Sequence, residues 1–173
     1  MNILDYMIDA PDFPTPGVVF KDMAPLFKSI EALRYITKTL ADPYRESNVD
    51  LITGIDARGF IFGAMLADEL GVGFVPIRKP GKLPGKTISE SYALEYGTDS
   101  IEIQADVITP GQRILMCDDV LATGGTMEAA CKLVRELGGE IVAAVFVMEI
   151  DYLPGRATIE ALGVEICSVE HLN

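Results

Sequence analysis

Two adjacent carboxylates stand before a glycine-containing loop in the second half of the chain. Asp118 and Asp119 follow the apolar run 114–117, which predicts a short buried strand that ends before the pair. The loop 122–126 comes next, and apolar residues then recur at helical spacing over 127–137, which indicates an amphipathic helix. A strand, a turn and a helix in this order predict a βα unit whose chemistry lies at the carboxyl end of the strand.

The small residues of this loop favour the binding of a phosphate group. A loop at a helix N-terminus presents free N–H groups and the positive end of the helix dipole. Gly124 and Gly125 let the backbone approach a ligand closely, and Thr123 and Thr126 add hydroxyl donors. With Ala122 they form the predicted phosphate loop.

The two adjacent carboxylates are expected to contact a different part of the ligand from the phosphate. Like charges repel, so Asp118 and Asp119 are not expected to bind the phosphate itself. They suit neutral hydroxyl groups attached to that phosphate, such as the 2- and 3-hydroxyls of a ribose. Taken alone, the two aspartates fit an ordinary turn before an acidic helix start, but the whole stretch 114–126 favours a ribose-phosphate site.

The stretch 114–126 resembles the 5-phosphoribosyl 1-pyrophosphate (PRPP) motif of the type I phosphoribosyltransferases. The resemblance implies that Asp118 and Asp119 bind the ribose hydroxyls and that the loop 122–126 binds the 5-phosphate. In hypoxanthine-guanine members of the family an Asp usually precedes Thr-Gly and is the proposed base toward the purine. Here that position is Ala122, so a general base has to come from elsewhere.

A second strand–loop–helix pattern precedes the first. The run 51–55 predicts a strand, the sequence Gly-Ile-Asp-Ala-Arg-Gly spans 54–59, and an apolar helical pattern follows. Arg58 in this turn either pairs with Asp56 at the surface or binds an anion. The turn resembles the pyrophosphate loop of the family, which implies that Arg58 contacts the pyrophosphate leaving group.

Basic residues gather in the Pro- and Gly-rich loop 78–87, the densest positive cluster of an acidic protein. We expect this loop to be a flexible flap that closes over an anion; a solvated linker is the alternative. The resemblance implies that Lys79 and Lys82 in this flap contact PRPP.

Alternating residues at 91–97 and 101–103 flank a turn and predict a β-hairpin after the flap. The string Tyr-Ala-Leu-Glu-Tyr-Gly in its first strand resembles that of the family, which implies that Glu95 is the catalytic acid/base. An exposed strand carboxylate is the alternative for Glu95. Glu149, near the end of a predicted strand over 141–150, is the second candidate for the acid/base.

The segment 13–22, Phe-Pro-Thr-Pro-Gly-Val-Val-Phe-Lys-Asp, cannot form regular structure through its middle. Either Phe20 fills the core, or the segment binds a planar heterocycle by ring stacking and backbone hydrogen bonds. It resembles the adenine-binding segment of the adenine-specific members of the family. That resemblance implies that Phe20 stacks on the base, that the backbone near Val19 pairs with its amine, and that Ile150 lies beside it. Lys21 stands where Arg is common in the family, so a compact ammonium group replaces the planar guanidinium at this position.

Composition limits the class of protein. The chain has 173 residues, which suits a single domain over 1–173. A net charge of −12 argues against nucleic acid or an anionic membrane as partner. Three separated cysteines show no zinc or disulfide spacing, and no secretory signal is evident, so we expect a cytoplasmic protein.

Strands that alternate with helices predict an α/β fold with a doubly wound, mostly parallel sheet flanked by helices and carrying the flap and hairpin. Residues 1–9 are predicted to form a short helix, and Ser29 is predicted to cap a helix over 30–40.

The resemblance spans 13–150 and includes five motifs in the order of the family. It implies the conversion of adenine and PRPP into AMP and pyrophosphate by a homodimer, with Mg²⁺ carried on PRPP rather than held by protein ligands. One alternative is a phosphoribosyltransferase for another base, such as a 6-oxopurine, against which Ala122 and the segment at Val19 and Phe20 argue. The other is a PRPP-sensing regulator without activity, which would need a DNA-binding segment or basic RNA-binding face that the sequence lacks.

Glu95→Gln is expected to slow the chemical step by at least about a hundredfold, because a positioned acid/base contributes about 10²–10⁴ in rate. Gln keeps the shape of the side chain but cannot take the proton that adenine loses. Dissociation constants for adenine and PRPP should change little. Single-turnover kinetics measure this, since product release can mask chemistry in the steady state. A chemical step within a few-fold of wild type would remove Glu95 from this role, and a large loss in Glu149→Gln instead would transfer the role to Glu149.

Overall fold

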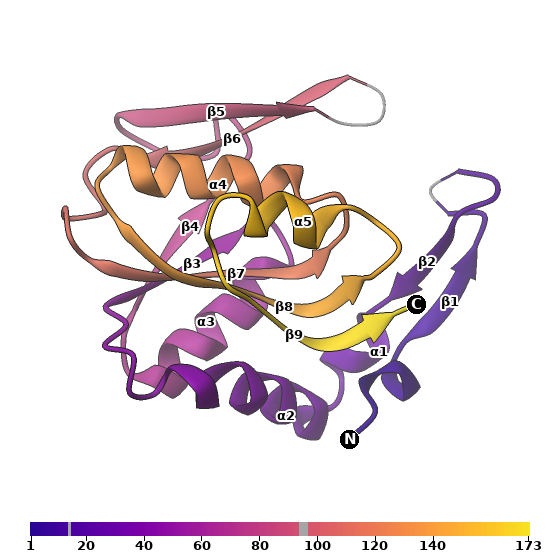
Figure 1. Cartoon of the computed structure of the whole chain (residues 1–173). Coiled ribbons are helices and arrows are strands. Elements are labelled where there is room, and N and C mark those ends of the chain that lie inside the picture. Colours follow the sequence, from indigo (N-terminus) through magenta and orange to yellow (C-terminus); the bar gives the residue numbers. More distant parts are fainter. Residues whose placement is uncertain (14, 94–96) are drawn as a thin grey trace.

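A five-stranded parallel sheet runs through the centre of the protein (Figure 1), seen here in a computed structural model that describes residues 1–13, 15–93 and 97–173. The strand order is β4-β3-β7-β8-β9, and every neighbouring pair is parallel. The strands are β3 (Leu51–Ile55), β4 (Gly73–Ile77), β7 (Arg113–Leu121), β8 (Glu140–Ile150) and β9 (Ile166–Leu172). This arrangement confirms the predicted α/β fold.

Helices cover both faces of the sheet, as a doubly wound fold requires (Figure 1). The lower face in the figure is covered by α2 (Ile30–Ala41) and α3 (Gly59–Leu70), and the upper face by α4 (Gly125–Glu136) and α5 (Gly155–Glu160). Side chains of β7 alternate between the two cores: Ile114 and Met116 join the core under α4, whereas Leu115 and Cys117 join the core against α2 and α3. The central strand is therefore buried on both sides, and its sequence is apolar without alternation.

A hairpin of β5 (Thr87–Ala93) and β6 (Thr98–Gln104) lies over α4 (Figure 1). The predicted hairpin is confirmed, although its first strand begins at Thr87 rather than at residue 91 and its second strand begins at Thr98 rather than at residue 101. Residues 94–96 of the predicted first strand lie outside the described residues. Ile101 and Ile103 on β6 are fully buried and belong to the core that α4 covers. Burial of these side chains fixes the base of the hairpin to the main body.

The N-terminal region differs from its prediction. The helix expected over 1–9 is wrong beyond the single 3₁₀ turn η1 (Ile3–Tyr6). The chain then extends into β1 (Ile8–Pro11), which pairs antiparallel with β2 (Val19–Asp22). Backbone hydrogen bonds between two segments eleven residues apart thus override a local apolar pattern that had indicated a helix. The short helices α1 (Ala24–Phe27) and η2 (Asp42–Tyr44) complete the described elements.

Local features of the sequence explain where α2 begins and why α3 packs closely on the sheet. Ser29 caps α2, because its Oγ accepts a hydrogen bond of 3.2 Å from the backbone N–H of Ala32. In α3 a Cβ added at Gly63 would lie 2.7 Å from the ring of Phe74, so the absent side chain permits close packing on β4. None of the helices in the described ranges has the length and apolarity needed to span a membrane.

Candidate active site

The acidic pair lies inside β7 rather than after it, which corrects the prediction of a strand that ends at 117. β7 continues to Leu121 because its pairing with β8 continues, through Asp118 with Phe146 and Leu121 with Glu149. On the other side, the pairing with β3 ends at Cys117 opposite Gly54. Beyond Cys117 the strand therefore has one free edge. An opening at the carboxyl end of a parallel sheet is where ligands bind in this class of fold.

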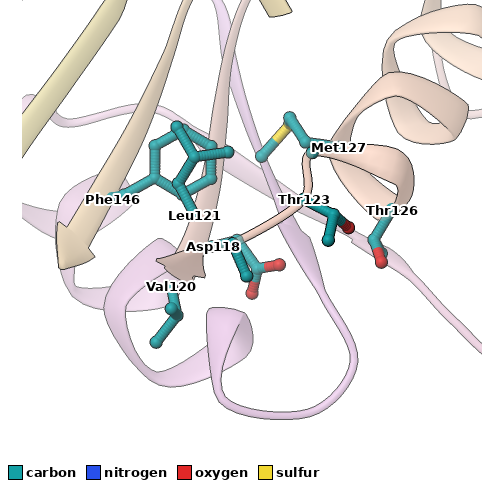
Figure 2. Close-up of a pocket in the computed structure, with 9 residues that line it drawn as sticks. Asp118, Val120, Leu121, Thr123, Thr126, Met127 and Phe146 are labelled. Atoms are coloured by element: carbon teal, nitrogen blue, oxygen red, sulfur yellow. The ribbon is translucent and has the colours of Figure 1, made fainter. Parts of the chain in front are cut away.

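The predicted phosphate loop joins β7 to α4 in the expected way. Gly124 adopts a positive φ of 87° as the residue before α4, and the helix begins at Gly125. A small pocket of about 70 Å³ is lined by Asp118 and by loop and helix residues including Thr123, Gly124 and Thr126. Figure 2 shows Asp118 at the end of its strand, with Thr123 and Thr126 on the loop and the first turn that follow.

Asp118 occupies an electrostatically unfavourable position. Burial raises the pKa of its carboxyl well above the ordinary value, and the charge of Asp119 raises it further. The start of α3 contributes to this burial, since a Cβ added at Gly59 would lie 2.9 Å from Oδ1 of Asp118. A glycine at the first position of α3 thus lets two βα turns meet at one point.

Arg58 connects the acidic pair to the predicted base site. It forms an ion pair with Asp119, which is 7% exposed, and its guanidinium carbon lies 5.3 Å from the centre of the Phe20 ring. The alternative partner considered for Arg58, Asp56, pairs instead with Arg78 at 3.2 Å. The guanidinium therefore lies between an aromatic face and the predicted ribose-binding carboxylates.

The structure brings all four predicted base-binding residues to one pocket of about 400 Å³. Val19, Phe20, Lys21 and Ile150 line it. Asp119 and Ala122 also line this pocket, so the predicted base and ribose-phosphate sites adjoin. Sequence reasoning missed five other lining residues: Val120, Met148, Tyr152, Leu153 and Leu172.

The missed residues share one kind of position in the fold. All five lie near the carboxyl ends of strands or in the connection that follows β8. Parallel strands bring such positions to one edge, but a single sequence does not reveal which strand neighbours which. Lys21 points partly away from the base pocket, since its Nζ lies 2.5 Å from a carboxylate oxygen of Asp9.

The two flap lysines are not among the described residues that line either pocket. Lys79 forms an ion pair with Asp99 and donates a hydrogen bond of 2.8 Å to the hydroxyl of Tyr92. Burial lowers the pKa of Lys79, but the hydrogen bonds with Asp99 and Tyr92 outweigh it and raise the pKa overall. Lys82 is exposed. Both lysines therefore stay predictions as PRPP contacts.

The structure describes only one of the two candidates for the acid/base. Glu95 lies outside the described residues, so its role stays a prediction. Glu149 is 2% exposed, and its carboxylate accepts hydrogen bonds from Arg156 and Ser168.

Known proteins resemble this chain over nearly its whole length. A family model described as the phosphoribosyl transferase domain matches residues 26–160. A relative from Acidobacterium capsulatum named adenine phosphoribosyltransferase is 53% identical over 154 residues, which cover 89% of this chain and 85% of the relative.

Solved structures agree with the sequence comparison. A crystal structure of adenine phosphoribosyltransferase from Thermoanaerobacter pseudethanolicus matches with a TM-score of 0.94 and 47% identity, and covers 98% of both chains. The Saccharomyces cerevisiae adenine phosphoribosyltransferase, solved with adenine and D-2,5-dideoxy-2,5-imino-altritol 1,6-bisphosphate, matches with a TM-score of 0.88 and 38% identity over 95% of this chain and 94% of that one. These matches confirm the family that the motifs indicated.

Asp118→Asn is expected to stabilise the fold at neutral pH. A carboxyl whose folded-state pKa is raised costs stability as the pH rises above its ordinary, unfolded-state pKa, and the cost grows by about 1.4 kcal/mol per pKa unit until the pH reaches the folded-state pKa. We expect a melting temperature at pH 7 higher by roughly 2–4 °C per kcal/mol, and a gain that vanishes below the ordinary aspartate pKa of about 4. Thermal melts followed by circular dichroism across this pH range measure it. The exposed Asp106→Asn changes the net charge equally and serves as control; equal gains in both variants would contradict the assigned cause.

Proposed function

The chain belongs to the phosphoribosyl transferase domain family, and from this premise we propose that it is an adenine phosphoribosyltransferase. In this role it converts adenine and PRPP into AMP and pyrophosphate. One observation carries the proposal: the 400 Å³ pocket lined by Phe20 and Ile150 shares Val120 and Ala122 with the small pocket of the phosphate loop. A base and a ribose phosphate held in these adjoining pockets would face each other across the end of β7.

Asp118 and Asp119 suit the ribose part of PRPP. Oδ2 of Asp119 is buried and accepts no hydrogen bond of good geometry from the described residues, although it lies beside Arg58. A buried acceptor in this state favours a ligand that donates, and ribose hydroxyls are neutral donors. The N–H groups at the start of α4 and the hydroxyls of Thr123 and Thr126 would then hold the 5-phosphate.

The base pocket suits a purine. The ring of Phe20 offers a stacking face, and Met148 and Ile150 supply apolar walls from the end of β8. Ala122 has no group that could take a proton, so the base has to lose its ring proton to a residue from another element.

The proposed reaction is a displacement at C1 of the ribose. Adenine N9 forms a bond to C1, the bond from C1 to the pyrophosphate oxygen breaks, and the N9 proton passes to a base, which we assign to Glu95. Positive charge develops on the ribose ring and negative charge on the leaving group. Arg58, Lys79 and Lys82 would stabilise the leaving group in a site closed to water, for which Lys79 has to exchange Asp99 for pyrophosphate oxygens.

Three further properties belong to this proposal. Mg²⁺ would enter with PRPP and neutralise part of its pyrophosphate charge, since substrate phosphates are among the usual ligands of this ion. The enzyme would act in the cytoplasm as a homodimer.

Adenine is expected to be used in preference to hypoxanthine, guanine and uracil. A backbone carbonyl near Val19 that accepts from the 6-amino group would face a lone pair of a 6-oxo group, and an unpaired buried acceptor costs roughly 1–3 kcal/mol, or about tenfold to a hundredfold in efficiency. Pyrophosphate release with each of the four bases measures this. Equal efficiency with adenine and hypoxanthine would favour the broader phosphoribosyltransferase alternative, and no release with any base would favour the regulator.

Asp118→Asn and Asp119→Asn are each expected to weaken PRPP binding much more than adenine binding, because hydrogen bonds to charged groups contribute roughly 1.5–3 kcal/mol. Calorimetric titration with PRPP and with adenine separates the two effects. Asp106→Asn again serves as the control for net charge, since it is exposed. Unchanged PRPP affinity in both site variants would contradict the assignment of the acidic pair to ribose.

A further inference from the structure

The connection from β8 to α5 lines the base pocket of the proposed active site and leads to a helix that contacts the phosphate loop. Met148 and Ile150 at the end of β8, and Tyr152 and Leu153 after it, line the base pocket. The chain then turns into α5 at Gly155. A short segment thus begins as a wall of the base pocket and continues as a helix over the phosphate loop.

α5 contacts the backbone of the phosphate loop directly. A Cβ added at Gly155 would lie 2.3 Å from the carbonyl oxygen of Ala122, and one added at Gly124 would lie 3.0 Å from the carbonyl oxygen of Gly155. The hydroxyl of Thr158 lies 3.2 Å from the carbonyl oxygen of Thr123 and 3.0 Å from that of Pro154, and its one proton is shared between these two acceptors. The conformation of the loop is therefore supported by a helix of only six residues.

So short a helix needs an anchor, and an ion pair between Arg156, whose side chain is 40% exposed, and the buried Glu149 supplies it. Both carboxylate oxygens of Glu149 accept from Arg156, at 2.7 Å from Nε and 2.6 Å from Nη2. Ser168 on β9 donates a further hydrogen bond of 2.9 Å to Oε2. Glu149 is 2% exposed, so an unpaired charge at this position would be strongly unfavourable.

Two other charged groups lie near this pair, but neither replaces the contact between Glu149 and Arg156. His171 lies 3.9 Å from Oε2 of Glu149 and 2.8 Å from its closer partner, Asp151. Arg156 also contacts Glu160 at 3.2 Å, but Glu160 is exposed at the surface. Among the described residues, the contact with Glu149 ties the first turn of α5 to β8, and the packing of Gly155 on Leu121 adds a contact with β7.

We propose that the Glu149–Arg156 ion pair positions the phosphate loop relative to the base pocket by holding α5 against the backbone of Ala122 and Thr123. Glu149 is then a positioning residue rather than the acid/base, because its oxygens are engaged by Arg156 and Ser168. This inference rests on the proposed function. It assigns to the pair a role in the affinity for the phosphorylated substrate, since that substrate contacts the loop.

The first test separates positioning from proton transfer. In Glu149→Gln and Arg156→Gln the KM for PRPP is expected to rise about tenfold to a hundredfold, because a displacement of about 1 Å far from the chemistry can have effects of that size. The single-turnover rate at saturating PRPP should change much less. The double variant should resemble either single variant, because the pair acts as a unit. Glu160→Gln removes only the exposed partner of the same arginine and should match wild type.

A second variant tests the contact without disturbing the ion pair. Gly155→Ala places a methyl group against the carbonyl oxygen of Ala122 and should also raise the KM for PRPP. Because this variant keeps both charged side chains, it remains informative if loss of either one prevents folding. Arg156→Lys, which keeps the charge but not the bidentate contact, should restore part of the PRPP affinity lost in Arg156→Gln.

A readout independent of activity keeps this inference separate from the proposed function. Amide hydrogen exchange at 122–126 should be at least about tenfold faster in Arg156→Gln and Gly155→Ala than in wild type and Glu160→Gln. Unchanged exchange in both variants, or a hundredfold slower chemical step with unchanged KM in Glu149→Gln, would overturn the positioning role. A wild type inactive with adenine and PRPP would refute the proposed function alone, because the exchange measurement would still decide whether the ion pair supports the loop.

Discussion

Two negative charges have to be held side by side at the end of the central strand, and the surrounding structure is arranged to make this possible. Asp118 and Asp119 lie in the last part of β7, where its pairing with β3 has ended but its pairing with β8 continues. Arg58 from the neighbouring βα turn offsets part of the charge on Asp119, while burial keeps the pKa of Asp118 raised. The site thus stores an unfavourable interaction that a hydroxyl-bearing or cationic ligand can relieve.

Close backbone approach is the second requirement, and glycines at two helix starts provide it. Gly59 lets α3 begin beside Asp118, and Gly155 lets α5 begin against Ala122. Any side chain at either position would displace a helix by a distance comparable to the tolerance of a binding site. The geometry of the site therefore depends on the absence of a side chain at these two glycines as much as on its polar groups.

The sequence predicted those parts whose signals are local. Apolar periodicity correctly predicted β3, α4 and most of β8, and Ser29 marked the start of α2. Signals failed where pairing between distant segments decides the structure: β1 replaced part of an expected helix, and β7 ran through its two aspartates because β8 continues beside it. The contact of Arg156 with Glu149 and the remaining walls of the base pocket could not be foreseen, because they depend on which strand ends are neighbours.

Three cations near the site are paired with aspartates: Arg58 with Asp119, Arg78 with Asp56, and Lys79 with Asp99. The side chains of Arg78 and Lys79 are 34% and 39% exposed, and those of Asp56 and Asp99 are 17% and 33% exposed. Ion pairs at such exposure contribute little to stability, about 0–1 kcal/mol. The side chain of Asp119 is only 10% exposed, so another group has to take the place of Arg58 when that pair opens. Charge-assisted contacts with phosphate oxygens are stronger, above all for the planar fork of an arginine. In the proposed reaction PRPP would therefore displace Asp56 and Asp99 at small cost, and its ribose hydroxyls would replace Arg58 at Asp119. A protein with a net charge of −12 can in this way hold its cations in place and still bind a polyanion.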